Sequence, residues 1–149
     1  MKLLPSIQGH ADLVKLAPFH RAALASEIRD FIVAHLAKTG GHLASNLGVV
    51  ELSIAIETVF DTAQDRLVFD VGHQAYVHKL LTGRQAAFER LRMFEGMSGF
   101  PKPHESRSDS FVAGHASSSV SIALGMARAR TLLQEDYDVV TPIGDGAAT

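Results

Sequence analysis

Residues 137–149 of the chain read Tyr137-Asp138-Val139-Val140-Thr141-Pro142-Ile143-Gly144-Asp145-Gly146-Ala147-Ala148-Thr149. Apolar and β-branched residues run into a Gly-Asp-Gly turn. This is typical of a buried strand in an open α/β sheet that presents a ligand site at its carboxyl end. Gly144 and Gly146 allow a sharp turn and a close approach to a ligand, and Asp145 offers the hard oxygen that Mg²⁺ prefers. We therefore predict a metal-binding turn at the end of this strand.

A second buried strand is predicted over residues 66–72, with His73 directly after it at the start of a helix. Strands that are separated by helices indicate an α/β fold, with a parallel sheet flanked by helices. If the two strands are neighbours, their carboxyl ends bring His73 and Asp145 to one edge of the sheet. A doubly wound domain of this length normally has more strands, so we expect the sheet to be incomplete and the chain to be part of a longer protein.

Further helices are predicted over residues 19–38, 48–59, 86–93 and 117–134. The first has apolar residues at helical spacing and ends before Gly40. The second is apolar nearly all round, which predicts deep burial, and either Ser45 or Asn46 is expected to cap it. Residues 95–114 are rich in Gly, Pro and Ser, and a loop of this length is often functional.

Three histidines lie where the chain switches between predicted elements. His42 is in a Gly-rich stretch between two helices, and from its position alone a catalytic role and simple bonding to the backbone are equally open. His73 is interpreted as a ligand-facing residue. His78 is interpreted as a surface or packing histidine, because a separation of five residues from His73 does not place both on one metal-binding helix face.

The segment Gly114-His115-Ala116 precedes three serines at the start of the last predicted helix. Small residues there would let an anionic ligand approach the backbone N–H groups at the positive end of the helix dipole. A plain capping role for the serines explains the pattern equally well. Both interpretations stay open at this point.

The composition indicates a globular protein, with 46% hydrophobic and 20% charged residues. A net charge of −2 gives no electrostatic argument for binding nucleic acid or an anionic membrane, and no apolar run approaches the length of a membrane span. The chain has no cysteine, which excludes thiolate chemistry and disulfides and fits a cytoplasmic location. We expect no partnership with nucleic acid or membrane.

Several common catalytic motifs are absent from the sequence. There is no P-loop, no His-Glu-x-x-His zinc motif and no Gly-x-Ser-x-Gly nucleophile motif. Residues 144–149 have two of the three glycines of a dinucleotide-binding loop, and Asp145 would repel a pyrophosphate that no metal bridges. A site that combines a metal with a phosphate-bearing ligand remains the coherent possibility.

Five stretches together resemble the 1-deoxy-D-xylulose-5-phosphate synthase family, in register over residues 20–149. They are residues 38–52 around Gly41-His42-Leu43-Ala44-Ser45-Asn46, residues 69–79 around Asp70-Val71-Gly72-His73-Gln74, Ser98-Gly99-Phe100-Pro101-Lys102, Gly114-His115-Ala116-Ser117-Ser118-Ser119 and Ile143-Gly144-Asp145-Gly146-Ala147. The resemblance implies a thiamine diphosphate- and Mg²⁺-dependent transferase. Such an enzyme decarboxylates pyruvate and joins the two-carbon unit to D-glyceraldehyde 3-phosphate, giving 1-deoxy-D-xylulose 5-phosphate for isoprenoid, thiamine and pyridoxal phosphate synthesis.

The resemblance also implies residue roles. Asp145 is expected to bind the metal, with His42 and His73 as catalytic residues. The expected cofactor-binding residues are His73, Gly114, His115, Ala116, Gly146 and Ala147. Ala116 departs from the serine that is usual in the family, which removes a side-chain hydroxyl from the cofactor segment. The family forms homodimers, which predicts a homodimer for the complete protein.

The resemblance implies that this chain is the N-terminal part of a thiamine diphosphate-binding domain. The family's metal-binding asparagine and its cofactor-activating glutamate are expected beyond residue 149, so synthase activity should require the remainder of the enzyme. Two alternatives stay open. The chain could be a short non-catalytic binding or regulatory relative, or part of a related carboligase with another acceptor.

Overall fold

The computed structural model describes residues 2–147, which form two compact units. Unit 1 consists of Met1–Phe60 and His73–Gly99, and unit 2 consists of Asp61–Gly72 and Phe100–Thr149. Ala148 and Thr149 of the C-terminal motif lie outside the described residues. None of the described helices is both long and apolar enough to cross a membrane.

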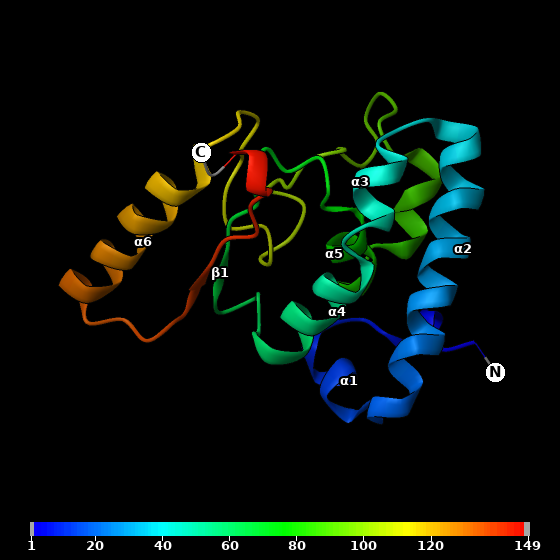
Figure 1. The fold of residues 1–149 in the computed structure, drawn as a ribbon, viewed down its shortest axis with the longest axis horizontal. Helices are drawn as coiled ribbons and strands as arrows, with labels where there is room; N and C mark the ends of the chain where they lie inside the picture. The colour runs from blue at the N-terminus through cyan, green and yellow to red at the C-terminus, as the bar shows by residue number, and fades with distance from the viewer. Residues whose placement is uncertain (1, 148–149) are drawn as a thin grey trace. The chain divides into compact units, whose positions relative to one another are not determined.

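Unit 1 is helical. Its elements are η1 (Leu4–Ser6), α1 (His10–Lys15), η2 (Pro18–His20), α2 (Arg21–Thr39), α3 (Leu43–Leu47), α4 (Val50–Val59), α5 (Tyr76–Leu81) and η3 (Gln85–Arg90). α2 is the longest, and α3, α4 and α5 all contact it (Figure 1). The core of this unit lies among these helices.

The predicted amphipathic helix is confirmed as α2. Its buried face repeats every fourth residue, at Leu24, Ile28, Ile32 and Leu36, so one side of the helix packs into the core. The helix ends at Gly40, whose φ of +71° is a conformation that glycine adopts readily. The expected glycine stop is therefore confirmed.

Other expectations for unit 1 are wrong in detail. The predicted loop between the first two helices contains the short helix α3, and Asn46 lies inside it rather than capping the next helix. α4 is not deeply packed all round, since Leu52 is 49% and Val59 is 69% exposed. Because α4 lies at the edge of the described core, only one of its faces is covered. The predicted helix over residues 86–93 is the 3₁₀ helix η3.

Unit 2 contains the two predicted strands. β1 (Arg66–Leu67) and β2 (Val139–Val140) pair in parallel, with Arg66 opposite Val139 and Leu67 opposite Val140. Further hydrogen bonds extend the pairing beyond the regular strands, because the Asp70 N–H donates to the Pro142 carbonyl at 3.1 Å. The parallel arrangement is confirmed, although the regular strands are shorter than predicted.

The rest of unit 2 is α6 (Ser119–Leu133), the 3₁₀ turn η4 (Asp145–Ala147) and a long irregular segment. Residues 100–118 contain no helix or strand, as expected for most of this stretch. α6 itself is largely exposed, with Val120 at 54% and Leu124 at 64%. Its apolar face is therefore not covered by any part of the chain that the structure describes within unit 2.

Candidate functional site

Unit 1 brings the two predicted catalytic histidines together. His42 lies at the start of α3 and is exposed, and His73, just before α5, is half-buried. Their ring centroids are 5.3 Å apart and the rings are inclined at 67°. The two imidazoles thus form a pair that one small ligand could reach, although 31 residues separate them in sequence.

The buried side chain of Asn46 connects the segments that carry this histidine pair. Its Nδ2 donates to the carbonyl of His42 at 2.6 Å and to the carbonyl of His73 at 2.9 Å. Its Oδ1 accepts the Tyr76 N–H at 2.9 Å, so one amide group joins α3, the His73 segment and α5. Sequence reasoning missed this role, because asparagine before a helix is the ordinary pattern of an N-cap.

The glycine before His42 is required by the packing around it. Gly41 has φ +137°, and a Cβ atom there would lie 2.9 Å from the Tyr76 hydroxyl and in collision with the Leu36 side chain. The same Tyr76 hydroxyl accepts the His42 N–H at 3.5 Å, at the limit of a hydrogen bond. The close approach of backbone to Tyr76 therefore sets the position of His42.

Unit 2 holds the predicted metal-binding turn. Asp145 begins η4 and is exposed, and its Oδ1 accepts the Gly146 N–H at 2.9 Å. The backbone turns here as predicted, because the Ala147 N–H donates to the Gly144 carbonyl at 3.0 Å, and neither Gly144 nor Gly146 needs a positive φ for this turn. A Cβ atom added at either glycine would meet nothing within 4 Å, so the backbone of the turn stays open to a ligand.

The predicted cofactor segment lies beside this turn within unit 2. The Ser117 hydroxyl, directly after Gly114-His115-Ala116, donates to the Ala147 carbonyl at 2.7 Å. Residues 114–116 are exposed, and a Cβ atom at Gly114 would also meet nothing within 4 Å. Two segments that were singled out separately in sequence are thus adjacent, with open backbone in both.

The start of α6 is occupied by a carboxylate of the protein itself. Asp70 accepts the Ser117 N–H at 3.1 Å and the Ser119 N–H at 3.3 Å. Neither interpretation of the serines from sequence anticipated this, and α6 has no side-chain cap from Ser118. An anionic ligand near this segment would therefore have to use the backbone before Ser117.

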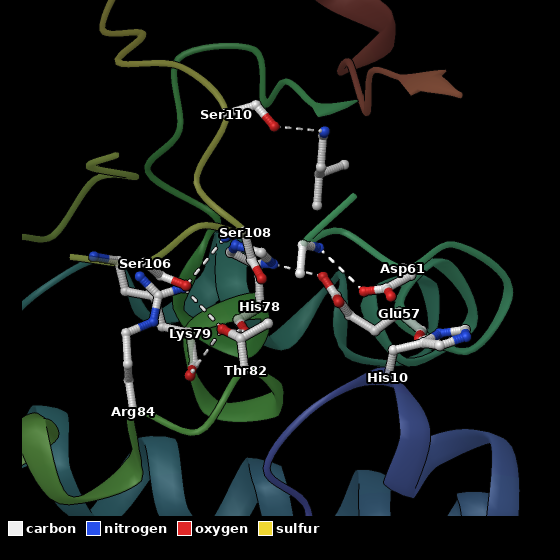
Figure 2. Close-up of polar contacts among 12 residues, drawn as sticks. His10, Glu57, Asp61, His78, Lys79, Thr82, Arg84, Ser106, Ser108 and Ser110 are labelled. Atoms are coloured by element: carbon white, nitrogen blue, oxygen red, sulfur yellow. Dashed lines mark hydrogen bonds and ion pairs between the residues drawn. The ribbon is translucent and has the colours of Figure 1, made fainter. Parts of the chain in front are cut away.

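Two further histidines have structural surroundings. His78 and Glu57 are each 1% exposed, and His78 Nδ1 donates to the Glu57 carboxylate at 2.5 Å, as Figure 2 shows. His78 is therefore a packing residue, one of the two roles predicted for it. The ring of His35 stacks on Phe31 with centroids 3.8 Å apart. These contacts stabilise unit 1.

The donor set around Asp145 is small. Within residues 2–147, no group of three or more acidic or histidine side chains is placed to hold a metal ion. One exposed carboxylate beside open backbone suits a cation that takes its other ligands from a phosphate-bearing molecule, water and further protein groups. The prediction that His73 and Asp145 share one sheet edge joins residues of different units, and it stays a prediction.

A parallel strand pair whose strands alternate along the chain with helices defines an α/β protein. The chain belongs to the 1-deoxy-D-xylulose-5-phosphate synthase family, because the family model of that description matches residues 4–149. The predicted family resemblance and the α/β fold class are confirmed.

Curated relatives with the same name agree with this assignment. The chain is 55% identical over 146 residues to the 1-deoxy-D-xylulose-5-phosphate synthase of Lachnoclostridium phytofermentans. It is 55% identical over 147 residues to that of Clostridium kluyveri, and 56% identical over 147 residues to that of Desulforudis audaxviator. These matches cover 98–99% of the chain and 23–24% of each relative. The chain therefore spans just under a quarter of the length of these relatives.

Proposed function

We propose that this chain provides part of the thiamine diphosphate-binding domain of a 1-deoxy-D-xylulose-5-phosphate synthase. The complete enzyme would be a transferase that joins pyruvate to D-glyceraldehyde 3-phosphate with loss of CO₂. The observation that supports the proposal is the hydrogen bond from the Ser117 hydroxyl to the Ala147 carbonyl, because it joins the residue after Gly114-His115-Ala116 to the Gly-Asp-Gly turn. The family match over residues 4–149 supports the choice of reaction.

The residues of unit 2 fit a diphosphate held through Mg²⁺. Asp145 would bind the metal, and the open backbone at Gly114, Gly146 and Ala147 would lie against the cofactor together with His115 and Ala116. Ala116 has no hydroxyl, so its contribution would come from its backbone. Mg²⁺ prefers six oxygens, and the remaining ligands would come from water, the diphosphate and other residues of the synthase.

The two histidines of unit 1 would transfer protons during the reaction. Thiamine diphosphate, when bound, supplies the carbanion-stabilising chemistry that decarboxylation of pyruvate needs. His42 and His73 would bind oxygen atoms of the substrate and would donate protons to these oxygens or accept protons from them. Imidazole suits this role near neutral pH. The separation of 5.3 Å between their ring centroids lets both reach one small molecule. His73 would also contact the cofactor.

The proposal extends to the assembly of the complete protein. We expect a homodimer in the cytoplasm, which binds pyruvate and D-glyceraldehyde 3-phosphate and no nucleic acid or membrane. The net charge of −2 and the absence of cysteine suit this assignment. Analytical ultracentrifugation of the complete synthase would test the dimer.

A chimaeric enzyme tests the proposed function. The chain would replace the matching 147 residues of the Clostridium kluyveri relative, and formation of 1-deoxy-D-xylulose 5-phosphate would be measured by mass spectrometry. We expect product from the chimaera, loss of product in its His73→Ala variant, and no release of CO₂ from pyruvate by the isolated chain. A folded chimaera that makes no product would contradict the proposal, as would CO₂ release by the isolated chain.

A further inference from the structure

The proposed function gives no role to the buried carboxylate of Asp70 in unit 2. Asp70 is 2% exposed and lies at the end of the parallel strand pairing. Burial raises the pKa of Asp70, but hydrogen bonds from the segment Ser117–Ser119 outweigh burial and lower the pKa below its usual range. The side chain is therefore an anion at neutral pH, held by the N–H groups of Ser117 and Ser119.

The backbone around Asp70 is fixed on both sides. Its N–H donates to the Pro142 carbonyl at 3.1 Å, and its own carbonyl accepts the Gly72 N–H at 2.7 Å. The second bond closes a three-residue turn around Val71, whose φ of +61° is strained for a β-branched residue. Strain of this kind persists where the surrounding structure holds a segment firmly, often near a functional site.

Ser117 donates its N–H to the Asp70 carboxylate and has an unusual conformation of its own. Its φ is +64°, in the left-handed region that few residues other than glycine adopt. In this conformation its N–H points to Asp70 while its hydroxyl donates to the Ala147 carbonyl at 2.7 Å. The Ala147 N–H in turn donates to the Gly144 carbonyl at 3.0 Å and closes the turn that contains Asp145.

We propose that Asp70 is a positioning residue for the Asp145 turn. Its carboxylate holds Ser117 in the left-handed conformation, and Ser117 then holds the turn against the segment Gly114-His115-Ala116. Asp70 acts through Ser117 and does not itself contact the cofactor. The inference rests on the proposed function for the roles of the two segments, whereas the mechanical link between them is independent of that function.

The mechanical link is tested in the chain itself, without cofactor, by ¹⁵N relaxation of the backbone amides. In Ser117→Ala the order parameters of Gly146 and Ala147 should fall from about 0.85 to below about 0.6, the flexible range, while amides in the middle of α6 keep their values. Asp70→Asn should loosen the same amides and also that of Ser119. Ser121→Ala, an exposed serine of α6, is the matched control and should change nothing.

Unchanged order of Gly146 and Ala147 in Ser117→Ala would overturn the proposal, even if Asp70→Asn failed to fold. A second measurement uses the chimaeric synthase. There, Ser117→Ala should raise the thiamine diphosphate concentration needed for half-maximal rate at least tenfold, with less than a twofold change in kcat at saturating cofactor. A fall in kcat at unchanged cofactor affinity would also overturn it. If the unsubstituted chimaera is inactive while Ser117→Ala loosens the turn, the proposed function fails and the link stands.

Discussion

Replacing Asn46 with alanine should separate the two histidines and destabilise unit 1. The substitution removes the donors to the carbonyls of His42 and His73 and the acceptor for the Tyr76 N–H, at distances between 2.6 and 2.9 Å. Asn46 and Tyr76 are both 0% exposed, so water does not reach the Tyr76 N–H easily. The change therefore leaves a buried donor without its acceptor.

The expected cost follows from these three bonds. An unsatisfied buried N–H costs about 1–3 kcal/mol, and each of the two other bonds contributes about 0.5–1.5 kcal/mol, which gives about 2–6 kcal/mol of unfolding free energy. Urea unfolding followed by circular dichroism would measure the difference. Thr58→Ala is the matched control, because it removes one side-chain bond, to the Ile54 carbonyl, in the same unit and should cost about 1 kcal/mol.

The histidine geometry gives a second readout of the Asn46 substitution. Nuclear Overhauser contacts between the His42 and His73 rings should be present in the unsubstituted chain and in Thr58→Ala, and lost in Asn46→Ala. The prediction would be contradicted if Asn46→Ala lowered the unfolding free energy no more than Thr58→Ala did and the contacts between the two rings persisted. Asn46 would then not hold the histidine pair together.

Three further predictions concern other parts of the chain. In the chimaeric synthase, His42→Ala should lower turnover at least tenfold and leave thiamine diphosphate affinity unchanged; steady-state kinetics with unchanged turnover would exclude His42 as a proton carrier. Gly41→Ala should destabilise unit 1 by more than about 1 kcal/mol, because its Cβ atom would collide with Leu36 and Tyr76. Gly125→Ala in α6 should stabilise unit 2 by about 0.5–1 kcal/mol, because its Cβ atom would meet nothing within 4 Å and alanine favours a helix. Equal melting temperatures for the two variants would refute this prediction. Because the folded-state pKa of Asp70 is lowered, its contribution to stability should be present above about pH 4 and be lost as the pH falls further through the folded-state pKa; acid unfolding that is identical in Asp70→Asn would contradict it.

Periodic features of the sequence predicted the fold well. The four-residue repeat of buried side chains in α2 is visible in the sequence because a helix that covers a core must place its apolar residues on one face. The apolar runs before Gly72 and Gly144 identified both strands, and helices between strands imply parallel pairing. The lengths of the strands and the short helix α3 depend on local hydrogen bonding, which composition does not determine.

The residues that connect segments of the site were not predictable in this way. Asn46 bonds to residues up to 30 positions away, and Asp70 bonds to Ser117, 47 positions away. Nothing local distinguishes them from an ordinary N-cap and from a polar residue near the end of a strand. Burial of a polar side chain is the signal that reveals such a role, and burial is known only once the chain is folded.

The most direct test of the account is to measure thiamine diphosphate binding by the chimaeric synthase. Isothermal titration calorimetry would be used, with and without Mg²⁺. We predict saturable binding that requires Mg²⁺, a loss of affinity of at least tenfold in Asp145→Asn, and unchanged affinity in Asp136→Asn, an exposed aspartate of the same unit. Binding that is equally tight in Asp145→Asn, or that does not depend on Mg²⁺, would contradict the assignment of the Gly-Asp-Gly turn as the metal-binding part of the cofactor site.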